Sequence, residues 1–309
     1  MGSEKRERKK SNQAARRAAL ETARKKAEQR QRARRFGILA VVVVVGVLGF
    51  TFFVSRGNGK SDPKANAGSS TTTTGDGGPT TTGKPLEAIA PVAGGKEIKG
   101  DTPCPKADGS EARAAKFEKA PPTCIDPKKK YTAVFDTGAG KVTVALDATN
   151  TPGTVNNFVV LARYKFYDGS SFQRTDPSIS IIQGGSPATQ SISDPGAGYT
   201  IKDEPTFTQD AASGGLKGPY KYVDGDLVMA RSQGADSSGA QFFFGAGPSV
   251  SNLDAQGTYI KFGHVTEGLD VLHKVLASHV DCPVGGGGSC LGGAPQPPVA
   301  VTKITITES

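Results

Sequence analysis

The sequence predicts a mainly β domain in the C-terminal part of the chain, preceded by a single transmembrane helix and a flexible linker. Three features lead to this prediction: many short segments of alternating apolar and polar residues, two amphipathic helical segments, and one uncharged apolar run near the N-terminus. Numerous short strands with only two helices favour a closed antiparallel barrel capped by those helices. A β-sandwich has the same periodicity and remains an alternative at this point.

The domain is predicted to begin with a β-hairpin. Residues 131–135 and 141–146 alternate apolar and polar side chains, and the sequence between them, Asp-Thr-Gly-Ala-Gly, favours a tight turn. Short strands separated by turns fill most of the following sequence, and residues 299–307 alternate again as a final strand. These segments would form the wall of the barrel.

Two segments have the periodicity of amphipathic helices. The first has Thr151 as its predicted N-cap and Pro152 in its first turn, and its apolar face carries Val155, Phe158, Val159 and Ala162. The second follows Glu267, and its apolar face carries Leu269, Leu272, Val275 and Leu276. Each helix is therefore expected to pack one face against the sheet.

The net charge of +9 comes from one end of the chain. Residues 1–35 contain 14 Lys or Arg and 4 Asp or Glu, whereas the remaining 274 residues carry 24 basic and 25 acidic side chains. The folded part is therefore almost neutral and offers no basic face to a phosphate backbone, which argues against nucleic-acid binding. Residues 1–35 are interpreted as a basic cytoplasmic tail.

Residues 36–54 form an apolar run of 19 residues without charge, close to the ~20 that a membrane-spanning helix needs. A cleaved signal peptide is disfavoured, because the basic segment before this run is long and no small-residue cleavage motif follows it. Basic segments stay on the cytoplasmic side of a membrane. We therefore expect a single-pass cell-membrane protein with a cytoplasmic N-terminus and an extracytoplasmic domain.

The sequence after the predicted membrane helix divides into three parts. Residues 55–103 are rich in Gly, Ser, Thr and Pro, a composition that predicts a flexible linker because it buries too little apolar surface to fold. Residues 104–130 contain two cysteines and several prolines with little periodicity, which predicts an irregular arm held against the domain. Residues 131–309 make up that domain.

All four cysteines, Cys104, Cys124, Cys282 and Cys290, lie on the predicted outer side of the membrane. Thiols in such compartments are usually oxidised, so two disulfides are expected, and three pairings are possible. The spacing lacks the Cys-x-x-Cys pair of a zinc site. No metal is therefore expected.

Seven short sequences follow one another in an order that resembles the cyclophilins. They are TPGTVNNF at 151–158, YDGSSFQR at 167–174, QGG at 183–185, GAGY at 196–199 with DE at 203–204, GDLVMAR at 225–231, GAQFFF at 239–244 and YIKFGH at 259–264. Each is weak alone, but seven in order are specific. The apolar run, the Thr-rich linker and the cysteine-containing arm also resemble membrane-anchored cyclophilins of actinobacteria.

The resemblance implies a closed eight-stranded barrel and the activity of a peptidyl-prolyl cis-trans isomerase, acting on proline-containing unfolded or extended polypeptides among secreted or cell-envelope proteins. Prolyl bonds rotate slowly because amide resonance imposes a barrier of roughly 18–20 kcal/mol. A fixed cation near the amide nitrogen stabilises the twisted transition state, and an apolar pocket favours the less polar twisted amide. This chemistry needs no cofactor.

The resemblance also assigns site residues. Arg174 is the expected catalytic cation, and Gln183 is expected to hold the substrate backbone. The expected substrate-binding residues are Phe172, Met229, Ala230, Arg231, Gln241, Phe243, Leu253 and Tyr259. Met229, Phe243 and Leu253 would form the slot for the proline ring, with Tyr259 at its rim. Ala230 and Arg231 would line the groove for the residue before proline, and Gln241 would fix Arg174 from beneath.

One departure from the family pattern leaves two hypotheses open. The loop 175–182 is one residue longer than usual, so one of Ile179, Ser180 and Ile181 would replace the phenylalanine of the family's pocket. The chain could then be a catalytically weak proline-peptide-binding module or holdase on the same fold. By apolar character alone, the slot residues such as Met229 would belong to the core.

Overall fold

The structure is a computed structural model of the chain. It describes residues 86–87, 89–210, 214–232, 234–282 and 291–309. The predicted basic tail, the predicted membrane helix, residues 55–85 of the linker and Cys290 lie outside the described residues. Within the described ranges, no helix combines the length and the apolar character that crossing a membrane requires.

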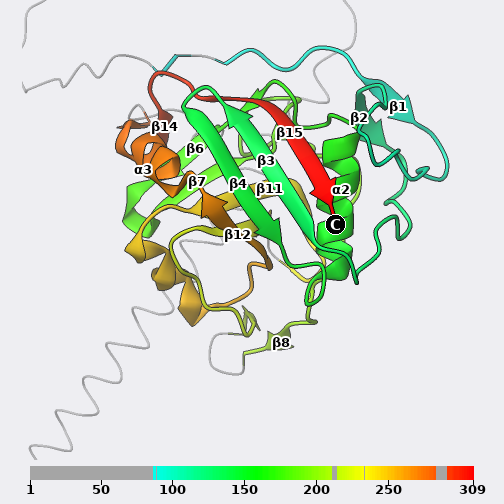
Figure 1. Cartoon of the computed structure of the whole chain (residues 1–309). Coiled ribbons are helices and arrows are strands. Elements are labelled where there is room, and N and C mark those ends of the chain that lie inside the picture. Colours follow the sequence, from blue (N-terminus) through cyan, green and yellow to red (C-terminus); the bar gives the residue numbers. More distant parts are fainter. Residues whose placement is uncertain (1–85, 88, 211–213, 233, 283–290) are drawn as a thin grey trace, which may run out of the picture. The chain divides into compact units, whose positions relative to one another are not determined.

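A curled antiparallel sheet forms the body of the fold (Figure 1). Its strands in chain order are β3 (Tyr131–Thr137), β4 (Gly140–Leu146), β5 (Ser170–Ser171), β6 (Arg174–Asp176), β7 (Ile181–Gly184), β10 (Asp226–Arg231), β11 (Ser238–Gly245), β12 (Lys261–Glu267), β13 (His279–Asp281), β14 (Gly293–Pro295) and β15 (Ala300–Glu308). Hydrogen bonds connect them in the order β13-β14-β6-β7-β11-β10-β12-β4-β3-β15-β5. One curled sheet thus replaces the sandwich alternative.

The prediction of eight strands needs correction, because this sheet has eleven in the described part of the chain. Two of the additional strands, β13 and β14, form a hairpin attached outside β6. The third arises where Phe172 and Gln173 interrupt one extended segment and divide it into β5 and β6. Strand β5 pairs with β15, and β6 pairs with β7. This single segment therefore pairs with the strands at both ends of the row that runs from β7 to β15.

The predicted hairpin and final strand are confirmed. Strands β3 and β4 pair from Tyr131↔Leu146 to Thr137↔Gly140, which leaves a two-residue turn. The Thr137 hydroxyl donates to the Gly140 carbonyl at 2.6 Å and accepts from the Ala139 amide, so the threonine side chain closes the turn. Strand β15 pairs along β3 and joins the C-terminus to the hairpin.

The two predicted helices are α2 (Pro152–Arg163) and α3 (Leu269–Ala277). Short 3-10 helices also occur at η1 (Pro177–Ile179) and η2 (Pro248–Ala255). Thr151 precedes α2, but its hydroxyl donates to the Asp147 carbonyl and does not cap the helix. The carboxylate of Glu204 instead accepts from the amides of Gly153 and Thr154 at 2.8 and 2.7 Å. A distant acidic residue therefore caps α2, in keeping with the positive N-terminal end of a helix.

Helix α2 inserts its apolar face into the core of the sheet. Phe158 is fully buried, and its ring lies 5.2 Å from Phe262, 5.3 Å from Tyr167 and 5.9 Å from Phe135, measured between ring centroids. Burying one such side chain stabilises a fold by roughly 1.5–3 kcal/mol. Together the rings form a closely packed interior on the inner side of the sheet, which fixes the positions of the strands.

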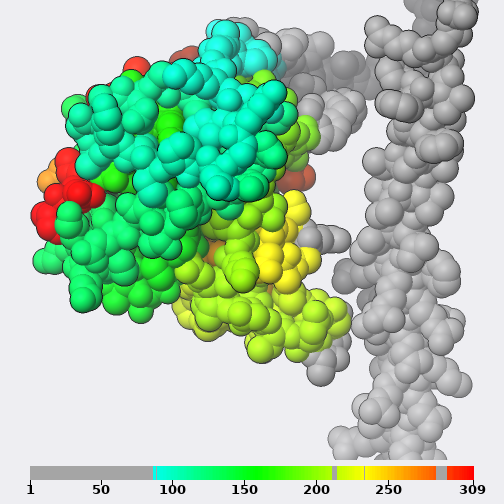
Figure 2. All heavy atoms as spheres, turned by 90° about the vertical axis from the view of Figure 1, so that its right-hand side faces the viewer, coloured from blue at the N-terminus to red at the C-terminus, as the bar shows by residue number. Residues whose placement is uncertain are grey.

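The cysteine-containing arm, residues 104–130, packs on the same helix. Strands β1 (Lys96–Ile98) and β2 (Ala114–Phe117) pair in parallel beside α2 (Figure 1), and a separate pair, β8 (Thr208–Gln209) and β9 (Leu216–Lys217), lies elsewhere. In Figure 2 the arm forms a continuous cyan to blue-green layer on the face shown. Strand β1 belongs to the range 55–103, so ordered structure begins before the predicted end of the linker.

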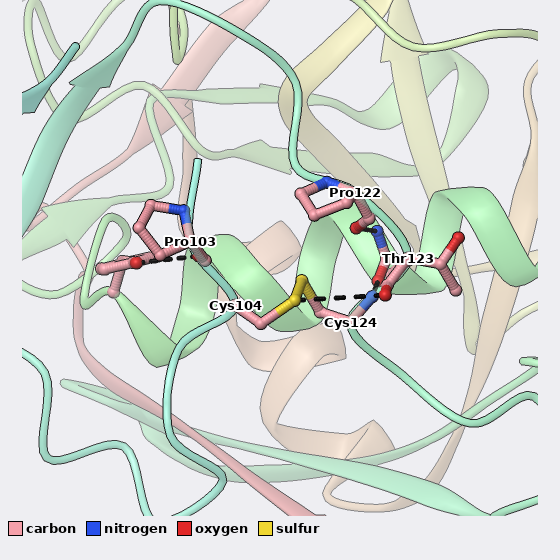
Figure 3. The surroundings of a disulfide bond; sticks show 7 residues. Pro103, Cys104, Pro122, Thr123 and Cys124 are labelled. Carbon is pink, nitrogen blue, oxygen red and sulfur yellow. Dashed lines mark hydrogen bonds between the residues drawn. A yellow bond between two sulfur atoms is a disulfide. The ribbon is translucent and has the colours of Figure 1, made fainter. Parts of the chain in front are cut away.

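A disulfide joins Cys104 to Cys124 within the arm (Figure 3). The Asn156 side chain on α2 accepts from the Cys124 amide at 2.7 Å and donates to the Pro122 carbonyl at 2.8 Å. This pair of bonds fixes the cross-linked segment to the helix. Cys282 is also disulfide-bonded.

Candidate active site

A cleft of about 540 Å³ lies on the outer face of the sheet. Side chains of successive strand residues point to opposite faces. On β11, Phe242 and Phe244 face the main core, whereas Gln241 and Phe243 face the cleft. The packed interior therefore supports one side of each strand while the other side is free to bind a ligand.

Three functional candidates from neighbouring strands lie in one row. Arg174 on β6 is paired with Gln183 on β7, and Gln183 is paired with Phe243 on β11. Directly opposed residues of adjacent strands project from the same face of a sheet. Strand register therefore brings a cation, an amide and an aromatic ring to one side of the sheet.

An apolar pocket occupies one part of the cleft. Ile181 and Phe243 form its floor, and Leu253 from η2 packs against them. The Tyr259 ring meets the Phe243 ring edge-on with centroids 5.5 Å apart. A pocket with aliphatic and aromatic walls suits a proline ring, which is apolar and compact.

Tyr222 holds the rim residue Tyr259 in place. The Tyr222 hydroxyl donates to the Tyr259 carbonyl at 2.9 Å and accepts from the Tyr259 amide at 2.8 Å. Burial raises the pKa of the Tyr222 phenol, because the surroundings disfavour a phenolate. The hydroxyl is protonated at neutral pH, and the raised pKa keeps it protonated at more alkaline pH as well.

The guanidinium of Arg174 is fixed by three acceptors. Its Nε donates to the Leu291 carbonyl at 3.1 Å, its Nη1 to Gln183 Oε1 at 3.1 Å and its Nη2 to Asp176 Oδ2 at 2.8 Å. A guanidinium has five N–H groups. Two of them, one on each terminal nitrogen, make no hydrogen bond to any described residue. Since 14% of the side chain is exposed, these donors can reach a bound peptide.

A second pair of hydrogen bonds continues this network. Gln183 Nε2 donates to Gln241 Oε1 at 2.8 Å, and Gln241 Nε2 donates to the Ile192 carbonyl at 3.2 Å. Gln241 thus fixes Gln183, and it acts on Arg174 only through Gln183. The predicted support of Arg174 by Gln241 is therefore indirect in the structure.

Comparison with known sequences agrees with this geometry. Residues 132–306 match the family described as "Cyclophilin type peptidyl-prolyl cis-trans isomerase/CLD". The chain belongs to the cyclophilin family. Its relatives carry the name of an enzyme, peptidyl-prolyl cis-trans isomerase, and the family match indicates the same enzyme class here.

Two bacterial relatives illustrate the similarity. Peptidyl-prolyl cis-trans isomerase B of Bacillus subtilis is 38% identical over 119 residues, which cover 38% of this chain and 71% of the relative. Probable peptidyl-prolyl cis-trans isomerase B of Mycobacterium tuberculosis is 28% identical over 229 residues, which cover 73% of this chain and 69% of the relative. A crystal structure of a Cryptosporidium parvum cyclophilin type isomerase aligns with 23% identity and a TM-score of 0.43, covering 58% of this chain and 99% of that one.

Most of the predicted site residues line the cleft of this cyclophilin. They are Arg174, Gln183, Ala230, Arg231, Gln241, Phe243, Leu253 and Tyr259. Their catalytic and binding roles remain predictions.

Phe172 and Met229 do not line the cleft. Both are 0% exposed and belong to the main core, so their assignment to substrate binding is corrected. Met229 precedes Ala230 on β10, and neighbouring strand residues face opposite sides. Since Ala230 faces the cleft, Met229 faces the interior.

Arg231 borders the cleft, but its guanidinium interacts with groups of the protein itself. The guanidinium pairs with Asp203 at 3.4 Å, donates to the carbonyls of Thr258 and Gly234, and lies over the Phe207 ring at 4.9 Å from its centroid. Its side chain is only 3% exposed. Arg231 therefore shapes the wall of the groove and presents little charge to a peptide.

The structure also identifies residues that sequence reasoning missed. Asp176 contacts Arg174, and the i, i+2 spacing on a strand was a signal that could have placed them on one face. Leu291 lines the cleft, although no local pattern indicates this. Of the three residues predicted as alternatives for the place of the family's pocket phenylalanine, Ile179 and Ile181 line the cleft.

Proposed function

We propose that this cyclophilin accelerates rotation about X-Pro bonds in secreted or cell-envelope proteins, with Arg174 stabilising the transition state. The observation that carries the proposal is the cross-strand row, which places free Arg174 donors and the apolar pocket on one face of the sheet. A proline ring in the pocket would bring its own amide bond beside the guanidinium.

In this mechanism the protein acts by preorganised electrostatics, and no covalent bond forms. Rotation removes amide resonance, so the prolyl nitrogen regains a lone pair that can accept a hydrogen bond. Arg174 offers a permanent charge and rigid donors for this purpose, and its three internal acceptors hold it in place. The interaction is stronger in the twisted state than in the planar state, which is the requirement for catalysis. Gln183 would bind substrate backbone.

A catalytically weak proline-binding module is the second candidate. One contact favours it: the Asp176 carboxylate lies 2.8 Å from Arg174 Nη2 and offsets part of the positive charge. The apolar pocket would bind a proline peptide equally well in this case. Only the rate of rotation distinguishes the two candidates.

Two-dimensional exchange NMR on a short Ala-Pro peptide, with the full chain at catalytic concentration, tests the proposal. We expect wild-type protein to produce cis-trans exchange, and Arg174→Ala to reduce the rate at least about tenfold, because a charge-assisted hydrogen bond contributes roughly 1.5–3 kcal/mol.

Lys116→Ala serves as the matched control, since it removes an exposed cation from the arm. Its exchange rate should equal that of wild type. Full activity in Arg174→Ala would remove Arg174 from the mechanism. Peptide binding by the wild-type protein without faster exchange would select the second candidate.

We also propose that the enzyme is anchored by residues 36–54, with the isomerase domain outside the cytoplasm. The sequence pattern of residues 1–54 supports this orientation. The bonded state of Cys104, Cys124 and Cys282 fits an oxidising compartment. Slow prolyl rotation limits the folding of exported chains, which gives an isomerase a role there.

A further inference from the structure

The β13–β14 hairpin extends the active-site edge of the sheet. Its strands pair from His279↔Pro295 to Asp281↔Gly293, and Gly293 is also paired with Thr175 on β6. The Thr175 hydroxyl lies 2.7 Å from His279 Nδ1. The hairpin is therefore attached directly beside Arg174.

Backbone contacts fix the residues that lead into β14. Gly292 has φ +76°, and a Cβ atom there would lie 2.8 Å from the Thr175 carbonyl oxygen, so this position requires glycine. The Gly292 carbonyl accepts from the Cys282 amide at 3.0 Å. The carbonyl of the preceding residue, Leu291, accepts a hydrogen bond from Arg174 Nε. The backbone of Leu291 is therefore held at the cleft independently of its side chain.

Leu291 is exposed at the cleft, where a ligand can contact its side chain. Among the described residues, three large apolar side chains are exposed, Val223, Val280 and Leu291, and of these only Leu291 lines the cleft. Leu291 is 53% exposed. Covering such a side chain is favourable in proportion to the apolar surface removed from water.

The hydrogen-bond network locates Leu291 along the cleft. It runs from the Leu291 carbonyl to Arg174, then through Gln183 and Gln241 to the Ile192 carbonyl. Leu291 and Ile192 thus lie at opposite ends of the network, with Arg174 next to Leu291. A peptide whose prolyl bond lies at Arg174 would extend one flank towards Leu291.

We propose that Leu291 is a specificity-determining residue, which contacts the substrate side chain on the Arg174 flank of proline and favours a bulky apolar residue there. The proposal rests on the proposed function only in taking the cleft as the site that binds X-Pro peptides. The ligand class is a proline-containing segment with an apolar neighbour, such as an unfolded chain exposes.

The test measures affinity separately from turnover. Fluorescence anisotropy is recorded on the full chain with four labelled proline peptides, which carry leucine or glycine immediately before or immediately after the proline. The variants are Leu291→Ala and, as the matched control, Val280→Ala, which shortens an exposed side chain of the same hairpin that does not line the cleft.

We expect wild-type protein to bind the leucine peptide about five- to twentyfold more tightly than the glycine peptide on one flank. Leu291→Ala should remove most of this preference and change glycine-peptide affinity less than about twofold, the size expected when no apolar contact is lost. Val280→Ala should retain the wild-type preference.

Equal affinity of wild type for leucine and glycine on both flanks, or a preference that survives in Leu291→Ala, would overturn the proposal. A Leu291-dependent preference without faster exchange would refute the proposed catalysis and leave this inference standing. Failure to bind any of the four peptides would overturn both.

Discussion

At the scale of single residues, the contact between Arg174 and Asp176 would decide how strongly the cation acts on a substrate in the proposed mechanism. The carboxylate accepts from Arg174 Nη2 and also from the Ser178 amide and hydroxyl, so it orients the arginine and caps η1. Opposite charges in close contact reduce each other's effect on a third group. Asp176 therefore has two opposing effects: it holds the Arg174 guanidinium in place, and it weakens the effect of its positive charge.

Asp176→Asn separates these two effects. Asparagine removes the negative charge and keeps one side-chain oxygen, which can still accept from the Ser178 amide and hydroxyl. Its amide nitrogen replaces the oxygen that accepts from Arg174, which keeps its bonds to Leu291 and Gln183. We expect the rate of prolyl exchange to rise about two- to fivefold, because the guanidinium charge is less offset. Asp176→Ala, which also loses the two hydrogen bonds from Ser178, should fall below wild type. A lower rate in Asp176→Asn, measured by exchange NMR, would show that attenuation is the smaller effect.

At the scale of elements, an ion pair joins the last strand to the first described α-helix. Buried Arg163 of α2 donates to Glu308 of β15 at 2.7 Å, and Lys129 donates to the same carboxylate at 3.1 Å. These hydrogen bonds, with Arg163 the larger contributor, hold the pKa of Glu308 below its ordinary value of 4.5. The pair thus links α2 to the C-terminus.

Glu308→Gln should therefore destabilise the fold in a pH-dependent way. A lowered pKa in the folded state stabilises the fold above pH 4.5, and this stabilisation disappears as the pH falls through the lowered value. We expect the variant to be less stable than wild type by roughly 1 kcal/mol at pH 7, and this difference to shrink as the pH is lowered to 3. Urea unfolding followed by circular dichroism at both pH values gives the comparison.

Glu267→Gln is the control for this prediction. It also removes one carboxylate, but Glu267 is exposed and forms no ion pair with the described residues. Its stability difference from wild type should stay near zero at both pH values. A Glu308→Gln deficit of the same size at pH 3 as at pH 7 would mean that the glutamate acts through packing and not through its charge.

At the scale of the whole molecule, the arm is part of the folded unit. Ala114, Phe117 and Ile125 are buried in the main core, and Phe117 packs its ring edge-on against Tyr164 at 5.5 Å. Arg113 also donates to the carbonyls of Lys165, Phe166 and Asp168. The predicted boundary at residue 131 therefore separates surfaces that pack together.

Two truncations test the roles of the arm and of the predicted anchor. The full chain should sediment with membranes, and a chain of residues 86–309 should be soluble and should isomerise the Ala-Pro peptide. A chain of residues 131–309 should be less stable, because it exposes the buried face under the arm. Cell fractionation and thermal unfolding measure both properties. Membrane retention of residues 86–309 would contradict an anchor at 36–54, and equal melting of both truncations would contradict the role of the arm.

The sequence alone was sufficient for the elements whose signals are local. The hairpin, both α-helices and the final strand follow from alternation, helical periodicity and turn residues within a few positions of each other. The resemblance of the ordered short sequences to the cyclophilins implied one site for Arg174, Gln183 and Phe243, and the structure shows that all three line one cleft. Local patterns carry such information because each reflects the burial of one face of one element.

Only the tertiary structure decided which face each strand presents and which distant segments meet. Met229 and Phe243 have similar apolar character, yet strand register turns the first into the core and the second into the cleft. Leu291 meets Arg174 across 117 positions of sequence through a hairpin attached to β6. Such contacts depend on pairing between remote strands, and apolar character at a single position cannot specify its partner or its face.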